Sequence, residues 1–446
     1  MMRNIQVPLK VQKILDTLEQ GGYEGYIVGG CVRDSLLGKQ PQDWDITTSA
    51  KPEEVKKLFK KTVDTGIAHG TVTVLLDKEG FEVTTYRIEG EYTDHRRPSE
   101  VAFTKNIVAD LQRRDFTINA IAYHPKVGFV DPFQGREDLK KGIIQCVGKA
   151  EERFDEDALR MLRATRFLAQ LGFNIEEKTY QAIQNQASLI QYISVERIRE
   201  EINKMLLSSH PKSFMILEDL GLLTYILPEF QMCIGVEQNH PYHCYTVAEH
   251  ILKTVEKVPA TLCYRWTMLL HDIGKPLTQT IDDKGIHHFY GHVEKSVELA
   301  QKILKRFKFD KKTAKHILRL INAHDEKIGE KERQIRRVVS RVGEDLFLDL
   351  LEIQKADIQG QNLNLMEKRL ERIESIRNTF LKMQKEKQCM SIKNLAINGK
   401  DLKEIGFIQG KKIGETLNQL FQYVIEDPGK NTKEELLSFA KQHLYE

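Results

Sequence analysis

The sequence predicts an α+β head, a small mixed sheet packed with helices, followed by a long all-α neck, body and tail. Short apolar strands alternate with helical segments in the first part of the chain, at 26–28, 44–47, 71–76, 81–86 and 120–123. From Glu151 onward the apolar residues recur with the helical period almost to the end. Strands followed by a run of helices favour an α+β head with a separate helical body.

The composition is that of a water-soluble protein. The 446 residues, 41% hydrophobic and 29% charged, have room for about two to four domains. The net charge is only +3, so any surface for RNA must come from local basic clusters. No apolar run is long enough to cross a membrane, and the six cysteines form no CxxC pair. We therefore expect a cytoplasmic protein with reduced thiols and no membrane partner, and the sequence leaves its oligomeric state open.

Changes in the pattern predict four domains, over residues 1–145, 146–237, 238–345 and 346–446. The mixture of strands and helices ends near Gly148, and Asn239-His-Pro-Tyr interrupts the helical pattern around 238–243. A long charged helix then begins near Asp345.

The first motif of the head is a glycine turn between a strand and a helix. An apolar strand runs into Gly29 and Gly30, and the helix that follows opens with Arg33. Backbone amides of such a turn can bind phosphate, and Arg33 is placed to hold a triphosphate. The alternative for Arg33 is a surface arginine paired with Asp34.

An acidic pair follows at Asp43 and Asp45. In an extended segment the two carboxylates point the same way, while Trp44 and Ile46 point into the core. Neighbouring carboxylates repel each other unless a divalent cation lies between them, and oxygen ligands favour Mg²⁺. A phosphate-binding turn beside metal carboxylates predicts nucleotidyl transfer. The alternative for the acidic pair is a polar turn.

Further head residues could complete this site. Glu82 lies on the strand face opposite Phe81 and Val83, so it is either a third metal ligand or a solvent-facing glutamate. Arg114, Asp115 and Asn119 lie in the run Arg113-Arg-Asp-Phe-Thr-Ile-Asn-Ala. Guanidinium groups suit phosphates and a carboxylate suits ribose hydroxyls. The alternative for Asp115 is a helix N-cap.

Five motifs appear in the order that they have in one family: Gly29-Gly-x-Val-Arg-Asp, Asp43-x-Asp, Arg113-Arg-Asp-Phe-Thr-x-Asn-Ala, Asp131-Pro-Phe-x-Gly and Glu156-Asp-Ala-Leu-Arg160. The chain resembles the class II bacterial tRNA nucleotidyltransferases, the CCA-adding enzymes, and their relatives the bacterial poly(A) polymerases. The resemblance implies template-independent addition of C, C and A to the 3′ end of tRNA. CTP and ATP would be the substrates, with two Mg²⁺ ions and release of pyrophosphate.

Glu156, Asp157 and Arg160 would read the base. We expect one helix to carry all three and to continue to Arg163, a further nucleotide-binding candidate. Asp157 and Arg160 then share a helix face, where Asp157 accepts from the exocyclic amine of C or A and Arg160 donates to the ring nitrogen. Uracil and guanine present the opposite pattern. The resemblance implies this templating role, and the alternative is a surface ion pair.

The polar segment 89–103 reads as a mobile loop with Arg96 and Arg97 in its second half. The resemblance associates a loop at this place with addition of the terminal A. It therefore argues against a CC-only enzyme, and leaves open A addition alone or an open-ended poly(A) polymerase.

A second metal site is predicted in the helical body. An adjacent His-Asp pair ends an apolar helix and can offer two ligands to one divalent metal. With an earlier histidine and a later aspartate the pattern resembles the HD phosphohydrolase superfamily; the four residues are His250, His271, Asp272 and Asp325. Further candidates are His292 and His324, and the alternative is histidines that only pack between helices.

These predictions assign the four domains as a nucleotidyltransferase head, a neck with the base-reading helix, an HD-type helical domain and a tRNA-binding tail. A rival function of another class is a metal-dependent phosphohydrolase whose catalyst is the HD region.

Overall fold

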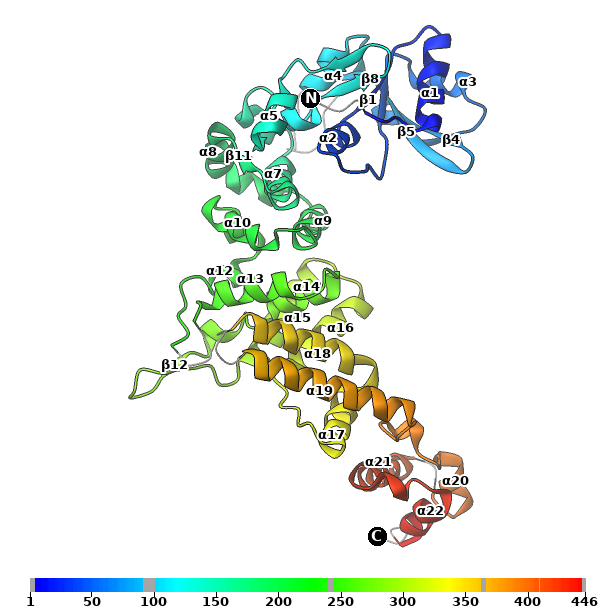
Figure 1. The fold of residues 1–446 in the computed structure, drawn as a ribbon, viewed down its shortest axis with the longest axis vertical. Helices are drawn as coiled ribbons and strands as arrows, with labels where there is room; N and C mark the ends of the chain where they lie inside the picture. The colour runs from blue at the N-terminus through cyan, green and yellow to red at the C-terminus, as the bar shows by residue number, and fades with distance from the viewer. Residues whose placement is uncertain (1–4, 91–100, 240–243, 362–365, 409, 443–446) are drawn as a thin grey trace. The chain divides into compact units, whose positions relative to one another are not determined.

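The computed structural model describes residues 5–90, 101–239, 244–361, 366–408 and 410–442 (Figure 1). The chain forms two compact units, Met1–Pro228 and Glu229–Glu446, and each is described by itself. Most of the predicted loop 89–103 lies outside the described residues. Among the residues described, no helix is long and apolar enough to cross a membrane.

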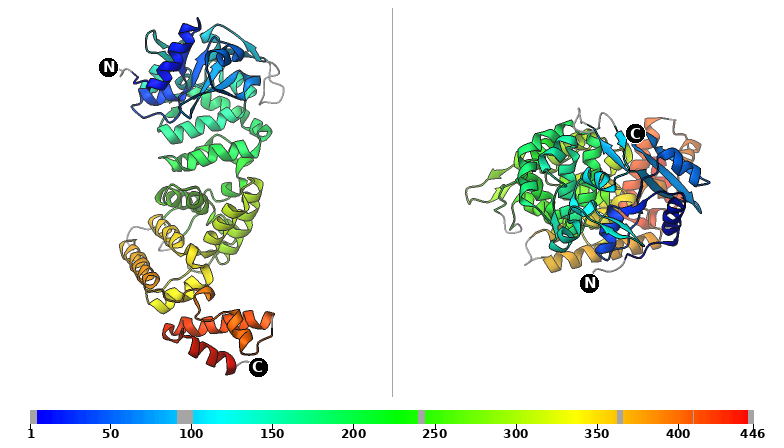
Figure 2. Two further views of the ribbon diagram at one scale, coloured as in Figure 1. Left: turned by 90° about the vertical axis from the view of Figure 1, so that its right-hand side faces the viewer. Right: turned by 90° about the horizontal axis from the view of Figure 1, so that it is seen from above.

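The first unit is built on a seven-stranded mixed sheet (Figures 1 and 2). Only the β2–β5 pair is parallel, and the other neighbouring pairs are antiparallel. The order across the sheet is β3 (Thr62–Gly66), β4 (Thr71–Leu76), β5 (Glu79–Thr85), β2 (Ile46–Thr48), β1 (Gly25–Val28), β8 (Ala122–His124) and β9 (Gly128–Val130). The predicted mixed sheet is therefore confirmed.

Three helices of the head pack against this sheet or against each other: α1 (Leu9–Gln20), α2 (Gly30–Leu36) and α3 (Pro52–Leu58). Helix α1 buries Val11, Ile14, Leu15 and Leu18, the helical repeat of an apolar face. A Cβ at Gly25 would lie 2.9 Å from Leu18 Cδ1, so the absence of a side chain there lets α1 lie close to β1. Helix α4 (Ile107–Gln112) and the two-stranded ribbon β6 (Arg87–Glu89) and β7 (Val101–Phe103) complete the head.

The first unit continues through α5 (Gly135–Lys141), α6 (Ala150–Glu156), α7 (Leu159–Leu171), α8 (Glu177–Gln186), α9 (Val195–Leu206), α10 (Ile216–Asp219), α11 (Leu223–Ile226) and the start of α12 (Pro228–Gln231). One helix was expected to carry Glu156, Asp157 and Arg160, and this prediction was wrong. Asp157 is extended, with φ −141° and ψ 100°, between α6 and α7. Its Oδ1 accepts from the Leu159 amide at 3.1 Å, a local bond that competes with helix continuation.

The second unit is almost entirely helical. Its helices are α13 (Val247–Lys257), α14 (Leu262–Leu270), α15 (His292–Arg306), α16 (Lys311–Ala323), α17 (Glu332–Val342), α18 (Glu344–Gln359), α19 (Met366–Lys385), α20 (Gly399–Glu404), α21 (Lys411–Glu426) and α22 (Lys433–Gln442). A small hairpin joins β12 (Thr280–Ile281) to β13 (His287–His288). Helices α18 and α19 lie side by side (Figure 1). Trp266 anchors the core against Phe307 and Phe309, with centroids 5.6 and 5.1 Å away. These helices confirm the predicted fold class.

The Asp131-Pro-Phe-x-Gly135 motif fixes the short helical turn Thr117–Asn119 in the head. Asp131 accepts from the Gly135 and Arg136 amides, at 2.7 and 3.0 Å, and so begins α5. A Cβ at Gly135 would lie only 2.1 Å from the Thr117 carbonyl oxygen. Glycine at this position is thus required for the close approach of α5 to the turn that carries Asn119.

We expect Gly135→Ala to destabilise the first unit by about 1–3 kcal/mol, because the added methyl must push α5 away from the 117–119 backbone. Urea unfolding followed by circular dichroism measures the change. The matched control is Gly414→Ala in α21, where a Cβ meets nothing within 4 Å. Equal stability of Gly135→Ala and wild type would contradict the packing described here.

Candidate active site

The turn between β1 and α2 places glycine backbone beside two arginines. Gly29 has φ +81°, a conformation that favours glycine. A Cβ at Gly29 would lie 3.2 Å from Arg114 Nη1, and one at Gly30 would lie 3.6 Å from Arg33 Nη2. The backbone of the turn therefore stays open between two guanidinium groups, an arrangement suited to an anion.

These residues line one cavity of about 290 Å³ in the first unit. Its walls include the predicted residues Gly29, Gly30, Arg33, Asp45, Arg114, Asp115, Asn119 and Arg163. Sequence analysis missed Arg166, Phe167 and Gln170, which also line it. The sequence did contain a signal for them. They follow Arg163 at the i+3, i+4 and i+7 positions, which lie on the same helix face as this predicted site residue.

Three arginine guanidinium groups lie around the Phe167 ring at the cavity wall. The guanidinium carbons of Arg166, Arg33 and Arg163 lie 4.1, 4.9 and 5.6 Å from its ring centroid. Cations over an aromatic face are stabilised, and long arginine side chains are thereby held in place. Three such cations around one cavity favour a ligand that carries several negative charges.

Asp115 links the predicted nucleotide-binding residues into one network. Its Oδ1 accepts from the Asn119 amide at 3.1 Å, and its Oδ2 accepts from Arg163 Nε at 2.7 Å. Asn119 Oδ1 in turn accepts from Arg33 Nη1 at 2.7 Å. Burial by itself would raise the pKa of Asp115, but Arg163 and Asn119 hold that pKa well below its usual range. Arg33 also pairs with Asp34, at 2.8 Å, so the expected local ion pair exists beside this network.

Asp110 was missed by sequence analysis and supports the two arginines of the motif. Its side chain is fully buried and lies 2.8 Å from Arg113 Nη2 and 3.5 Å from Arg114 Nη2. The Thr47 hydroxyl, on β2, also donates to it at 3.2 Å. The i, i+3 and i, i+4 spacing to the arginines was its only sequence signal.

The three candidate metal carboxylates lie near the neighbouring strands β2 and β5, in the middle of the sheet. Ile46 pairs with Val83 in the parallel β2–β5 register. Asp45, directly before β2, and Glu82, in β5, each come one residue before this pair. Desolvation raises the pKa of Asp45, the Arg114 guanidinium lowers it, and the carboxylates of Glu82 and Asp43 raise it further. Desolvation is the largest cause of this upward shift, and the negative charges of Glu82 and Asp43 add to it.

Two details differ from the predicted arrangement. β2 begins at Ile46, so Asp43 and Asp45 precede the strand. Trp44 is half-buried and does not belong to the core, whereas Ile46 is 1% exposed as expected. The donor set itself consists only of carboxylate oxygens, which fits a hard divalent cation such as Mg²⁺.

The candidate base-reading residues are held by different partners. Arg160 Nη1 lies 2.5 Å from Glu156 Oε2, and its Nη2 donates to the Arg113 carbonyl at 3.0 Å. Asp157 instead accepts from Arg197 of α9 at 2.8 Å. Arg197 was missed because it lies 40 residues further along the chain, and only tertiary packing brings it to Asp157.

In the second unit, His250, His271 and Asp272 come together as predicted candidates, with ligand atoms within 4.8 Å of one another. The carboxylate beside the two histidines belongs to Asp357 and not to the predicted Asp325. Asp357 Oδ1 lies 3.0 Å from His250 Nε2 and 3.6 Å from His271 Nε2. Asp325 lines the adjoining cavity. Asp357 had no local sequence signal, since it is one acid within the long helix α18.

Comparison with known proteins places this geometry in a family. Residues 25–145 match a family model described as the poly A polymerase head domain. Residues 172–233 match the model "Probable RNA and SrmB- binding site of polymerase A", and residues 282–440 match domain 2 of the tRNA nucleotidyltransferases.

Curated relatives match over nearly the whole chain. The CCA-adding enzyme of Lactobacillus helveticus is 37% identical over 97% of this chain and 96% of its own length. That of Ligilactobacillus salivarius is 36% identical over 98% and 97%. A crystal structure of the Bacillus stearothermophilus CCA-adding enzyme in complex with CTP superimposes with a TM-score of 0.72, at 29% identity and 98% coverage of both chains. The chain therefore belongs to the family of CCA-adding enzymes, a group of nucleotidyltransferases.

Proposed function

We propose that this protein adds C, C and A to the 3′ end of tRNA, using CTP and ATP and releasing pyrophosphate. The observation that carries the proposal is the head cavity, where Asp45 lies beside the arginine-lined glycine turn. Glu82 and Asp43 are close enough to act on the Asp45 carboxylate. The names of the full-length relatives, and the CTP bound by the Bacillus stearothermophilus enzyme, support the substrates.

The residues of the cavity have separable roles in this reaction. Arg33, Arg163 and Arg166, arranged around Phe167, offer donors to the triphosphate. The Asp115–Asn119 pair can hold ribose hydroxyls while it fixes Arg33 and Arg163. The 3′ oxygen of the RNA attacks the α-phosphorus, and the bond to the bridging oxygen of pyrophosphate breaks.

Asp43, Asp45 and Glu82 would hold Mg²⁺, which lowers the pKa of an RNA 3′-hydroxyl and offsets negative charge at the reacting phosphate. The unfavourable effect of Glu82 and Asp43 on the Asp45 carboxylate supports this role, because a cation between them would relieve it. The carboxylates thereby also mark the end of the cavity where the primer 3′ end must lie.

For base choice, we propose that Asp157 accepts from the exocyclic amine of C or A while Arg160 donates to the ring nitrogen. Both side chains are already hydrogen-bonded in the protein, Asp157 to Arg197 and Arg160 to Glu156. The groups that a base must satisfy are thus held in defined positions before it arrives. Arg197 then acts as a positioning residue for Asp157.

A second divalent ion is proposed in the second unit, at His250, His271 and Asp272, with Asp357 as the fourth ligand. Two imidazole nitrogens and two carboxylates form a donor set typical of transition-metal or zinc sites. We also keep the four-domain assignment, with the tail 346–446 as a tRNA-binding segment, as a proposal. All six cysteines are free, which supports our expectation of a reducing, cytoplasmic compartment.

We expect Asp45→Asn to lower the rate of CTP incorporation into tRNA that lacks its CCA end by about 10³-fold, since the substitution removes a metal ligand at the reacting phosphate. Radiolabel incorporation measures the rate. Asp16→Asn in α1, where Asp16 is partly exposed and pairs with Lys126, is the charge-matched control and should leave incorporation unchanged. Retained incorporation by Asp45→Asn would remove the proposed reaction site.

We expect Asp157→Ala to reduce the preference for CTP over UTP by about 10²-fold in kcat/KM, because the carboxylate acceptor no longer faces the base. Arg197→Ala should weaken discrimination less, since Asp157 remains but is less well oriented. Incorporation assays with each nucleotide give the ratio. Unchanged selectivity in Asp157→Ala would contradict the role assigned to this carboxylate.

The extent of addition separates full CCA addition from the rivals. Given CTP alone, the enzyme should stop after two residues, and with ATP added it should complete one A and stop. Sequencing-gel analysis of the tRNA product checks this. A growing A tail would identify a poly(A) polymerase, and no product with CTP alone would identify an A-only enzyme.

Removal of metal should lower the melting temperature of wild-type protein by about 4 °C or more, because an ion bound only by the folded state stabilises it. Melting with and without a chelator, followed by circular dichroism, measures the shift. The shift should be smaller in His250→Ala. An identical chelator effect in His250→Ala and wild type would place the stabilising ion elsewhere.

A further inference from the structure

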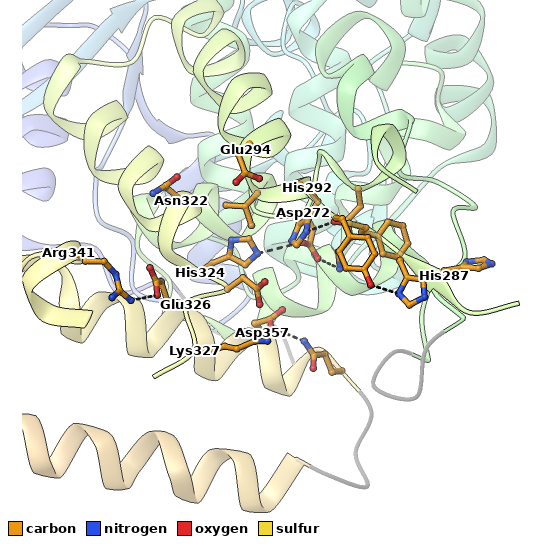
Figure 3. A pocket seen from close by; sticks show the side chains of 18 residues that line it. Asp272, His287, His292, Glu294, Asn322, His324, Glu326, Lys327, Arg341 and Asp357 are labelled. Carbon is orange, nitrogen blue, oxygen red and sulfur yellow. Dashed lines mark hydrogen bonds and ion pairs between the residues drawn. The ribbon is translucent and has the colours of Figure 1, made fainter. Parts of the chain in front are cut away.

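Two cavities adjoin each other in the head. The larger, of about 290 Å³, is the one lined by the glycine turn and by the arginines around Phe167. The smaller, of about 170 Å³, is lined by residues of β4, β5 and β6. Asp45 and Arg114 line both cavities, so the two meet at the candidate metal carboxylates. Threonines, arginines and acids form the wall of the smaller cavity, whereas His292 and His324 lie in the wall of the second unit's cavity (Figure 3).

The smaller cavity lies on the polar face of β4 and β5. In the antiparallel register Thr71 pairs with Thr84, and Glu82 comes two residues before Thr84 on β5. Side chains alternate between the two faces of a strand, so these three share one face. The intervening Val72 and Val83 are completely buried on the other. A pair of threonines therefore lies beside one of the candidate metal carboxylates.

The two threonine hydroxyls form a hydrogen-bonded pair. Thr71 Oγ1 and Thr84 Oγ1 lie 3.0 Å apart, and either oxygen can be the donor. One proton lies between the two oxygens, so the pair keeps one O–H donor and further lone pairs as acceptors. Both side chains are partly exposed and line the cavity, so a ligand can reach them. The 2′-hydroxyl of a ribose both donates and accepts, and this pair can satisfy both of its functions.

Arg87 and Arg113 supply positive charge to the same cavity. Both are held by Asp110, whose Oδ1 accepts from the Arg87 backbone amide at 3.2 Å and from Arg113 Nε at 3.0 Å. The Arg87 side chain also donates to the His69 carbonyl. Guanidinium groups held in this way suit the oxygens of a phosphodiester. Hydroxyls for a sugar and cations for a phosphate together fit one nucleotide at the end of an RNA.

Nucleotidyl transfer joins two substrates, a nucleoside triphosphate and an RNA end, at the metal carboxylates. The three arginines around Phe167 match the triphosphate to the larger cavity. We propose that the smaller cavity holds the terminal nucleotide of the RNA, and that the Thr71–Thr84 hydroxyl pair recognises its 2′-hydroxyl. This inference rests on the function proposed above, and adds a site and a sugar specificity for the second substrate.

A contact at the 2′ position also orients the reacting atom. The 2′- and 3′-oxygens of a ribose are neighbours, so fixing the first limits where the second can lie. Glu82 is on the same sheet face as the hydroxyl pair, and Asp45 lines the same cavity. A ribose bound by the threonines thus presents its 3′-oxygen beside the carboxylates. Thr71 and Thr84 are specificity-determining residues, and the bonds that form and break remain those of nucleotidyl transfer.

A change in the RNA sugar tests the assignment. Two tRNAs that lack the CCA end are compared, one with an ordinary terminal ribose and one with a 2′-deoxyribose there. We expect wild-type enzyme, given CTP, to add C to the deoxy-ended tRNA with a kcat/KM about tenfold lower, because the hydroxyl pair loses its partner.

Removal of one hydroxyl should abolish this difference. Thr71→Val keeps the shape of the side chain, and it should lower kcat/KM about tenfold for the ribose-ended tRNA and leave the deoxy-ended tRNA almost unchanged. Thr84→Val should behave in the same way, and the KM for CTP should stay at the wild-type value in both. Thr71→Ser restores the hydroxyl and should restore the preference for ribose.

Thr73→Val is the matched control. Thr73 is on the same face of β4, but its hydroxyl pairs with that of Thr65 at 2.8 Å, outside the lining of the smaller cavity. This variant loses a paired threonine hydroxyl from the same strand and should keep the full preference for ribose. Circular dichroism melting of each variant shows whether the fold is retained, and the Thr71→Ser result stands for the site if a valine variant unfolds.

The outcomes separate this inference from the proposed function. Addition of C to both tRNAs at equal rates by wild type would overturn recognition of the 2′-hydroxyl and leave nucleotidyl transfer standing. An equal loss on both tRNAs in Thr71→Val would have the same meaning. A higher KM for CTP in Thr71→Val, with the KM for tRNA unchanged, would place the incoming nucleotide in this cavity and overturn the inference. Failure of wild type to add C to either tRNA would overturn the proposed function itself.

Discussion

Two buried carboxylates, Asp110 and Asp115, hold the arginines of the head cavity in place. Without them, several guanidinium groups within one small volume would repel one another and turn toward solvent. Asp110 secures Arg113 and Arg114 from the side of the sheet, and Asp115 secures Arg163 together with Asn119. The arginines can lie close together around the cavity because the carboxylates of Asp110 and Asp115 partly balance their positive charge.

In the head, the cavity depends on contacts between strands and helices. Asp110 lies in α4 and accepts a hydrogen bond from Thr47 on β2. Asp115 accepts one from Arg163 on α7. The glycine turn, the candidate metal carboxylates and the arginines come from segments far apart in the chain. Gly135 contributes to the same site, because the absence of a side chain there lets α5 approach the turn that carries Asn119.

The sequence alone was sufficient to predict those features that depend on residues close together in the chain. The mixed sheet, the helical body and the residues of short motifs such as Gly29-Gly30 or Arg114-Asp115 depend on neighbours within a few positions, and these predictions reached the cavity. The break at Asp157 was missed because the helical period of the segment outweighs a single capping aspartate. Trp44 was misplaced because alternation was extended to residues that precede β2. Arg197 and Asp357 depend on contacts between distant helices, which no local pattern encodes.

The two units differ in the side chains that surround their cavities. In the head, arginines and carboxylates surround a cavity without histidine, which suits binding a triphosphate and an oxygen-preferring ion. In the second unit, four histidines surround one aspartate. Imidazole nitrogens with a carboxylate are ligands that softer divalent ions accept.

Gly360 shows how narrowly the second centre is specified. A Cβ at this position would lie 2.5 Å from Thr254 Cγ2 and 3.3 Å from His250 Nδ1, while the Gly360 carbonyl is the one that orients His250. Substitution at position 360 is consequently restricted by the close contacts with Thr254 and His250. Descendants of this chain that no longer need the centre should be recognisable by the relaxation of this glycine, together with the loss of the histidines.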